Sequence, residues 1–526
     1  MSEPEGGWPS IAEMLRASAH AHADRVAVVD GDRTMSYTDL FEESRRFAAA
    51  LVADGVERGD RVSIWAFNSA EWIIAVLGIH QAGATLIPIN TRFKGLEASE
   101  LLRRGRVGVL IAVTDFLGTD YVEMLESTEE DLPDLRTIVA ARGPATAPSV
   151  SWADFLDRAT DADFDEVDRR RTLIGPDDPA DMLFTSGTTG TPKGVIATQS
   201  QTLAVAQDWA VMTGLSEDDR YLMVNPYFHM FGLKAGILAS TSVGACMLPV
   251  PVFDVAASLR AVEREQITVF PGAPTLYGSI LEHPERSAFD LSTLRVAVTG
   301  AADIPVELIR RIYAELPFDY VVSGYGLTEA GTAASTSRDD TPEKIATTVG
   351  KARPGFEIRV ADEFDAPVPA GKVGQILLRG PSVMSAYLDD PETTAAVLSD
   401  DGWLRTGDLG RFDKDGYLTI VGRTKEMFIV GGFNAYPAEI ESILMRHPSI
   451  TNVAVVGIPD ERMGEVGMAF VVASEPVDEA DVIAWSRNNM ANYKVPRQVR
   501  IIDELPLNAT GKVQKSALLE QTPRPS

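Results

Sequence analysis

Cysteine is almost absent from this chain of 526 residues, which contains only Cys246. A single cysteine excludes an internal disulfide and any metal cluster built on several cysteine ligands. Cys246 stands in the stretch "GACMLPV", whose small and apolar residues favour a buried thiol over a nucleophile. We therefore expect the chemistry of this protein to need no thiol of its own.

Positive charge is also scarce. The chain has 48 Lys and Arg against 76 Asp and Glu, a formal net charge of −28. The overall field repels polyanions, which argues against non-specific binding to nucleic acid or to an anionic membrane. A site for a polyanionic ligand must therefore gather Lys, Arg, backbone dipoles or a divalent cation that reverse this field locally.

Long apolar runs are missing as well. The first residues, "MSEPEGGWPS", have neither the basic nor the apolar region of a secretory signal. The best candidate for a membrane span, "WIIAVLGIHQAGATLIPI", is interrupted by His80, Gln81 and Gly83. We expect a cytoplasmic protein without integral membrane association. With 526 residues, 45% of them hydrophobic, the chain predicts at least two domains.

The Walker A nucleotide loop is a further absence, since no Gly-Lys pair is followed by Ser or Thr. Instead, the stretch "TSGTTGTPKG", Thr185 to Gly194, combines five hydroxyl residues, three glycines, one proline and one lysine. Glycines let backbone N–H groups turn toward one point, and hydroxyls add donors, so the loop suits a phosphate chain. A flexible linker is the alternative, but a lysine and a proline between the apolar runs "DMLF" and "VIA" are untypical of linkers.

Short apolar runs alternate with helical patterns along most of the chain. "RVSIWA" precedes a helical pattern in which Asn68 and Glu71 have capping-box spacing and Gly83 marks the end. "ITVFPG", "LRVAVTG" and "YVVSGYG" are typical of buried strands that end at glycine turns. This alternation predicts parallel sheets covered by helices, with ligands at the carboxyl ends of the strands. After about residue 341, short strands between turns predict a small β-rich subdomain, and the last 100 residues or so predict an α+β domain.

Four further stretches form a set with the loop. They are "YGLTE" (325–329), "TGD" (406–408), "GRTKE" (422–426) and "LPLNATGKVQK" (505–515). In this order the set resembles the adenylate-forming superfamily of acyl-CoA synthetases, luciferases and peptide-synthetase adenylation domains. The resemblance implies an α/β fold with a large N-terminal domain over 1–424, made of two parallel-type βα subdomains and a small β-barrel-like subdomain. A small, mobile α+β C-terminal domain over 425–526 would carry the catalytic lysine.

The resemblance also implies how ATP is held. Tyr325 would stack on adenine and Gly326 would belong to the same cofactor-binding segment, Thr328 would donate to the α-phosphate, and Glu329 would bind Mg²⁺. For Tyr325 taken alone, a core aromatic is the alternative. Asp408 and Arg423 would bind the ribose hydroxyls. The small residues beside adenine would be Gly300, Ala301 and Ala302, and those around the β- and γ-phosphates Thr185, Ser186, Gly187, Thr188, Thr189, Gly190, Thr191, Pro192 and Lys193.

Lys512, in "NATGK", is implied to be catalytic together with Thr328 and Glu329. A carboxylate that attacks the α-phosphorus brings two anions together, and a positioned ammonium offsets the charge that builds up. Lys425 matches the hinge about which the C-terminal domain rotates between the two half-reactions.

The resemblance also implies which four residues line the channel for the acyl group and coenzyme A. Gly431 and Gly432 would line the path of the thiol, and Arg92 would contact a coenzyme A phosphate. His229 would gate the acyl channel, with a core histidine as the equal alternative. The sequence departs from the family pattern at Gln199, Gln375 and Glu426, which affects the expected shape of the pocket rather than the reaction.

The predicted function is an AMP-forming acid:CoA ligase that uses ATP, Mg²⁺ and coenzyme A. The segment "SIWAFNSAEW…INTRFKGLEASELL", Ser63 to Leu102, resembles a group of bacterial ligases that includes those for propanoate side chains of partly degraded steroid rings, which favours a bulky alicyclic acid. Medium- or long-chain fatty acids and aryl acids are the alternatives. An acyl-AMP ligase that loads a carrier protein, and a non-catalytic acyl-nucleotide binder, are the rival functions. The sequence leaves the oligomeric state open, a homo-oligomer included.

Overall fold

The computed structural model describes residues 7–185, 192–300, 304–423, 426–430, 433–460, 462–490, 492–508 and 512–522. The chain divides into two compact units. The first comprises Met1–Ala346, Ala352–Phe356 and Arg379–Gly402, and the second Thr347–Lys351, Glu357–Leu378 and Trp403–Ser526. Residues 424 and 425, where the sequence places the domain boundary, lie outside the described residues.

The first unit contains two large sheets. In one of them eight neighbouring strands follow the order β15-β14-β13-β12-β10-β11-β1-β2. From β14 to β1 they are parallel, whereas β15 and β2 pair antiparallel with their neighbours. The three runs predicted as buried strands are β12, β13 and β14. The bounds are β1 (Val26–Asp30), β2 (Arg33–Ser36), β10 (Arg220–Met223), β11 (Cys246–Pro249), β12 (Val269–Pro271), β13 (Val296–Gly300), β14 (Tyr320–Leu327) and β15 (Gly331–Ser335).

The second sheet of this unit has the order β19-β9-β8-β4-β3-β5-β6-β7. Strands β3 to β8 are parallel, while β9 is antiparallel to both β8 and β19. The expected parallel sheets are therefore confirmed. The bounds are β3 (Arg61–Trp65), β4 (Thr85–Pro88), β5 (Val107–Val113), β6 (Thr137–Arg142), β7 (Val150–Ser151), β8 (Pro179–Thr185), β9 (Lys193–Thr198) and β19 (Ala386–Tyr387).

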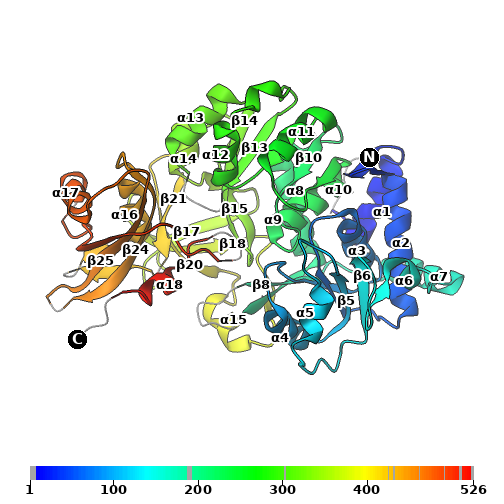
Figure 1. Cartoon of the computed structure of the whole chain (residues 1–526). Coiled ribbons are helices and arrows are strands. Elements are labelled where there is room, and N and C mark those ends of the chain that lie inside the picture. Colours follow the sequence, from blue (N-terminus) through cyan, green and yellow to red (C-terminus); the bar gives the residue numbers. More distant parts are fainter. Residues whose placement is uncertain are drawn as a thin grey trace. The chain divides into compact units, whose positions relative to one another are not determined.

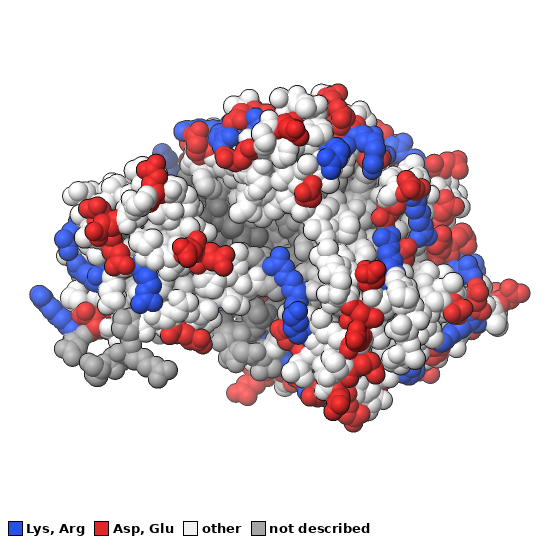
Figure 2. All heavy atoms as spheres, in the orientation of Figure 1, with Lys and Arg blue, Asp and Glu red and all other residues white. Residues whose placement is uncertain are grey.

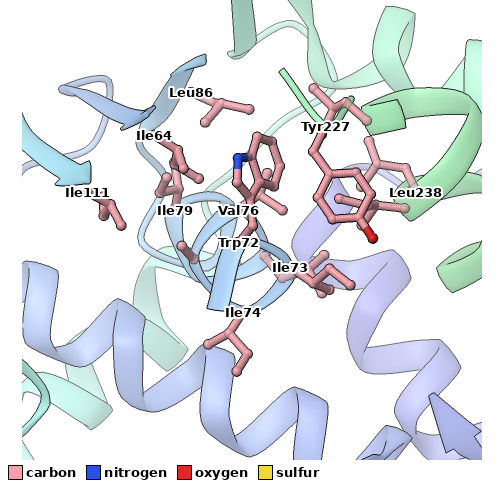
Figure 3. Close-up of a cluster of buried hydrophobic side chains, with 14 of the residues drawn as sticks. Ile64, Trp72, Ile73, Ile74, Val76, Ile79, Leu86, Ile111, Tyr227 and Leu238 are labelled. Atoms are coloured by element: carbon pink, nitrogen blue, oxygen red, sulfur yellow. The ribbon is translucent and has the colours of Figure 1, made fainter. Parts of the chain in front are cut away.

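Helix α3 (Ala70–Gln81) lies between the two sheets, since it contacts β1 of one sheet and β3 and β4 of the other. A helix that is apolar all round is suited to such a position, and every residue of α3 except Glu71 is buried. Figure 3 shows Ile64, Leu86 and Ile111 on one side of this helix and Tyr227 and Leu238 on another. Each large apolar side chain buried here contributes about 1.5–3 kcal/mol to stability.

The start of α3 differs by one residue from the prediction. Ser69, not Asn68, caps the helix, with its hydroxyl accepting from the amide of Trp72. The Asn68 side chain instead donates to two backbone carbonyls, those of Met223 and Asn225, and accepts from the amide of Tyr227. The capping-box prediction was therefore wrong, because tertiary hydrogen bonds engage Asn68. The end marked by Gly83 is confirmed, two residues after Gln81.

The remaining helices of the first unit cover its sheets, and α2 packs against α1, α3 and α7 (Figure 1). The helix η1 (Leu233–Leu238) is a π-helix. The α-helices are α1 (Ile11–Ala21), α2 (Tyr37–Ala53), α4 (Gly95–Gly105), α5 (Tyr121–Glu126), α6 (Trp152–Leu156), α7 (Asp161–Arg171), α8 (Gln199–Thr213), α9 (Met230–Gly232), α10 (Ala239–Val243), α11 (Val255–Glu265), α12 (Pro274–Glu282), α13 (Val306–Glu315), α14 (Pro342–Thr347) and α15 (Pro391–Val397).

The second unit holds two smaller sheets. The first, in the order β17-β18-β20-β21, is the predicted β-rich part, and a small core of Ala361, Leu377 and Trp403 packs within this unit. The second has the order β23-β22-β25-β24, with β26 parallel to β25, and carries a separate hydrophobic core. The bounds are β17 (Glu357–Ala361), β18 (Gly374–Arg379), β20 (Leu404–Phe412), β21 (Leu418–Arg423), β22 (Phe428–Val430), β23 (Phe433–Ala435), β24 (Ile450–Asp460), β25 (Gly464–Ala473), β26 (Gln498–Ile501), α16 (Pro437–Leu444), α17 (Glu479–Asn489) and α18 (Lys515–Leu519).

The surface reflects the acidic composition, with Asp and Glu side chains spread over the face seen in Figure 2. Among the described residues, no helix combines the length and the apolar character that crossing a membrane requires. Cys246 on β11 is 4% exposed, and burial raises the pKa of its thiol to about 11. A buried, protonated thiol is a poor nucleophile, so the prediction from its neighbours is confirmed.

Candidate active site

The predicted phosphate loop connects the antiparallel strands β8 and β9. Thr185 at the end of β8 lies opposite Lys193 at the start of β9. The carbonyl of Pro192 accepts a hydrogen bond from the guanidinium of Arg104. The loop therefore belongs to a hairpin that is anchored at both ends. Six of its residues, Ser186, Gly187, Thr188, Thr189, Gly190 and Thr191, lie outside the described residues.

The "YGLTE" segment forms the end of β14 and the turn into β15. Tyr325 is buried, and Thr328 and Glu329 are half-buried. A side chain on Gly326 would lie 2.3 Å from the carbonyl oxygen of Gly331, so the close approach of these two strands requires glycine here. Gly300, at the carboxyl end of β13, pairs with Gly324 in register. Ala301 and Ala302 lie outside the described residues.

Glu329 and Lys193 meet through Tyr387, which is only 7% exposed. The Tyr387 hydroxyl donates to Oε1 of Glu329 over 3.0 Å, and Nζ of Lys193 lies 4.9 Å from the centre of its ring. Within the described part of the chain, neither Lys193 nor Glu329 forms an ion pair. The structure thus brings the predicted phosphate lysine and the predicted magnesium ligand to one aromatic ring.

The donor set around Glu329 fits magnesium. No group of three or more His, Cys, Asp or Glu side chains gathers in the described residues, as a dedicated metal cage would require. Magnesium bound with a nucleotide takes one or two carboxylates, phosphate oxygens and water. The half-buried carboxylate of Glu329, which shares Tyr387 with Lys193 of the predicted phosphate hairpin, meets that requirement.

Asp408, Arg423 and Lys512 belong to the second unit. Asp408 on β20 and Arg423 on β21 are paired in register, with Nε of Arg423 3.1 Å from Oδ1 of Asp408. The amide of Lys512 donates to the Asn508 side chain, and the carbonyl of Lys512 accepts from the Asn508 amide. Lys512 is exposed as a residue, yet partial desolvation and the charge of Arg423 lower the pKa of its ammonium, against an opposing effect of Asp408. The predicted ribose pair and the predicted catalytic lysine therefore influence one another electrostatically.

Lys515 is a residue that the sequence did not single out. Its ammonium lies 3.0 Å from Oε2 of Glu426 and 2.9 Å from Oε1 of Glu441. Burial alone would lower the pKa of Lys515, but the two carboxylates outweigh it and raise this pKa. Glu426, a departure from the family pattern, thus ties the segment after the predicted hinge to the helix that follows Lys512. Lys425, Gly431 and Gly432 lie outside the described residues.

The predicted channel residues lie in different settings. His229 is half-buried, and its Nδ1 accepts from the amide of Phe231 at the start of α9. Arg92 is exposed on the loop after β4. Gln199, expected to affect the pocket, is buried and accepts from the amide of Ile11, so it anchors α1. Gln375 lies on β18 opposite Leu409.

The structure also contains a buried charge cluster that the sequence analysis did not predict. Nζ of Lys234, on the π-helix, lies 2.9 Å from Oδ1 of Asp181 on β8, and both side chains are at most 3% exposed. The Thr202 hydroxyl donates to the other oxygen of Asp181 over 2.6 Å. His80 is buried nearby, with neither ring nitrogen hydrogen-bonded, and burial lowers its pKa to about 4. The cluster links the strand that enters the phosphate loop to the segment after His229.

The order and pairing of these motifs define an AMP-binding enzyme, and comparison with known proteins agrees. Residues 15–388 match the family described as AMP-binding enzyme, and residues 439–512 match its C-terminal domain. The chain belongs to this family, which confirms the resemblance inferred from its motifs.

Individual relatives are similar over almost the whole chain. The chain is 46% identical over 526 residues to the 3-[(3aS,4S,7aS)-7a-methyl-1,5-dioxo-octahydro-1H-inden-4-yl]propanoyl:CoA ligase of Rhodococcus jostii, with 99% of this chain and 100% of the relative covered. It is 47% identical to the ligase of the same description from Mycobacterium tuberculosis, covering 94% and 96%. The crystal structure of the anthranilate CoA ligase AuaEII with anthranoyl-AMP has a TM-score of 0.86 at 29% identity, covering 97% of both chains.

Proposed function

We propose that this protein is an AMP-forming acid:CoA ligase whose substrate is a propanoate carried on a bicyclic, steroid-derived ring system. The observation that carries the proposal is the 46% identity, over essentially full length, to a ligase for a methyl-dioxo-octahydroindenyl propanoate. The presence of Lys193, Glu329 and Lys512 in the chain supports catalysis rather than silent nucleotide binding.

In the first half-reaction, an oxygen of the substrate carboxylate attacks the α-phosphorus of ATP, and pyrophosphate leaves. Lys193 and the loop from Thr185 to Pro192 would hold the leaving phosphates, and Thr328 would donate to the α-phosphate. Tyr325 and the segment at Gly300 would hold adenine, Gly326 would belong to the same cofactor-binding segment, and Asp408 and Arg423 would hold the ribose. Lys512 would stabilise the charge that accumulates between carboxylate and phosphate.

Magnesium is part of this proposal. Glu329 would hold the cation, which when bound neutralises charge on the phosphates of ATP. The role of the protein is to present one oriented carboxylate beside the lysine that binds the same phosphates.

In the second half-reaction, the sulfur of coenzyme A attacks the acyl carbonyl carbon, the thiol proton is lost, and AMP leaves. We propose that Lys425 is the hinge for the change between the two half-reactions. Gly431 and Gly432 would line the path of the thiol, and Arg92 would bind a coenzyme A phosphate. His229 would contact the acyl group. No thiol of the protein takes part, which agrees with the buried state of Cys246.

The test is a pyrophosphate-release assay with ATP and Mg²⁺ on a panel of fatty, aryl and ring-bearing propanoic acids, with and without coenzyme A. We expect the bicyclic propanoate to be turned over best and thioester to form only with coenzyme A. Better turnover of a fatty or aryl acid would overturn the substrate, and adenylate without thioester would favour carrier loading. A panel without any pyrophosphate release would overturn the ligase itself.

The Lys512→Ala variant tests the mechanism. Loss of one charge-stabilising group costs about 10²–10³ in rate, so adenylate formation should fall by that factor. Thioester formation from a supplied acyl-adenylate and coenzyme A should change little. Lys372→Ala, at an exposed lysine between β17 and β18, is the matched control and should leave both half-reactions intact. A cytoplasmic location and a homo-oligomeric state stay predictions from the sequence.

A further inference from the structure

The segment 382–388 is hydrogen-bonded to both halves of the proposed phosphate and cation site. Toward β9, the amide of Leu388 donates to the carbonyl of Gly194 over 2.7 Å, and β19 pairs with β9. Toward the turn after β14, the amide of Met384 donates to the carbonyl of Glu329 over 2.7 Å. The Ser382 hydroxyl donates to the carbonyl of Ala330, also over 2.7 Å. The backbone therefore fixes Tyr387 between the end of the phosphate loop and Glu329.

The side chain of Tyr387 uses this position twice. Its hydroxyl donates to Oε1 of Glu329, and its ring accepts the ammonium of Lys193 at 4.9 Å from the ring centre. A hydroxyl that donates to one oxygen of a carboxylate fixes the direction of the other oxygen. An aromatic face attracts an ammonium without neutralising its charge.

The ring also separates two opposite charges. A direct ion pair between Lys193 and Glu329 would compete with phosphate for the lysine and with a cation for the carboxylate. Within the described residues each of the two side chains contacts Tyr387, and they do not pair with one another.

We propose that Tyr387 is a positioning residue of the nucleotide site, which orients Glu329 toward the cation and holds Lys193 apart from it. This inference rests on the proposed ATP-dependent function. Tyr387 touches the two residues that would bind the phosphates and the cation, and acts through them.

The test measures binding rather than turnover. Calorimetry gives the affinity for ATP without a divalent cation, and electron paramagnetic resonance of Mn²⁺ gives the affinity for the cation in the presence of ATP. For Tyr387→Phe we expect Mn²⁺ to bind about tenfold more weakly, as when the outer-shell partner of a metal ligand is lost, with metal-free ATP affinity within twofold of wild type. For Tyr387→Leu, which also removes the ring, metal-free ATP affinity should fall as well.

Two controls separate positioning from general damage. Tyr37→Phe removes a fully buried hydroxyl, bonded to the carbonyls of Ser240 and Ala245, and should leave both affinities unchanged. In a Glu329→Gln background, Tyr387→Phe should add less than twofold to the loss of Mn²⁺ binding, because the two changes act on one hydrogen bond.

The outcomes are distinct. Three results would overturn the role of Tyr387: unchanged Mn²⁺ binding in Tyr387→Phe, an equal loss of metal-free ATP affinity in that variant, or additive effects of the two substitutions in the Glu329→Gln background. Each of these results would leave the proposed ligase function standing. Wild-type protein that binds neither ATP nor Mn²⁺ with ATP would instead overturn the proposed function.

Discussion

Replacing Lys234 by methionine is expected to destabilise the first unit by about 3–5 kcal/mol, the usual cost of breaking a buried ion pair from one side. The Nζ of Lys234 lies 2.9 Å from Oδ1 of Asp181, and the two side chains are 3% and 1% exposed. At an effective dielectric constant of about 20, their attraction at this distance is roughly 6 kcal/mol, before the desolvation of both charges is subtracted. Without the ammonium, the Asp181 carboxylate would keep the Thr202 hydroxyl as its hydrogen-bond donor.

Replacing both partners should behave differently. With Asp181→Leu added to Lys234→Met, no charge is left buried in this pair, and most of the lost stability is expected to return, to within about 1–2 kcal/mol of wild type. If Lys234→Met destabilised the protein only through lost packing, the double variant would be at least as unstable as the single one. The stability of the double variant therefore distinguishes a buried unpaired charge from a packing defect.

Urea unfolding followed by tryptophan fluorescence is the assay. Of the seven tryptophans, all but Trp403 and Trp485 belong to the first unit, so the signal reports chiefly on the unit that holds the ion pair. A loss below about 1 kcal/mol in Lys234→Met would refute the reasoning, because it is far below the cost of an uncompensated buried charge. A double variant no more stable than the single one would refute it as well.

Three further predictions concern stability. Because burial holds the pKa of His80 at about 4, against about 6.5 when unfolded, acidification protonates the unfolded state first. The free energy of unfolding should therefore fall between pH 6.5 and 4 by up to about 3 kcal/mol. His80→Leu should lack this part of the pH dependence, and parallel curves of unfolding free energy against pH for the two proteins would contradict the prediction. Gly78→Ala places a methyl group 2.7 Å from the Ser44 carbonyl oxygen and from Phe47 Cδ1, where α3 crosses α2, which should cost about 1–3 kcal/mol. Gly278→Ala meets no atom within 4 Å in α12 and should instead stabilise by roughly 0.5–1 kcal/mol; fluorescence-detected unfolding midpoints check both, and shifts of equal sign would count against the packing argument.

The parallel sheets and the fold family were predictable because short stretches of the sequence indicate them. A buried strand such as β13 is a short apolar run that ends in glycine, and five motifs in a set order leave little room for another fold family. The strands on either side of the 185–194 loop form a hairpin, and the phosphate-binding role inferred from its composition stays a prediction.

What could not be predicted depends on contacts between distant segments. Tyr387 is 58 residues from Glu329 and 194 from Lys193, and nothing in the stretch around it indicates either partner. Lys234 stands among apolar residues, where a lysine suggests exposure unless its partner is known. The cap of α3 shows the same limit on a small scale, because both Asn68 and Ser69 are good capping residues and only the tertiary partners of Asn68 decide between them.

Cys246 is the chain's one cysteine and its thiol is buried, so we expect the native protein not to react with thiol reagents. Free coenzyme A can therefore be titrated in the presence of the enzyme with little background, and its consumption followed continuously. Because no native thiol competes for the reagent, the protein is also suited to site-specific labelling. One cysteine introduced at an exposed position of each unit would carry a donor and an acceptor dye, and energy transfer between them would report the separation of the two units during each half-reaction.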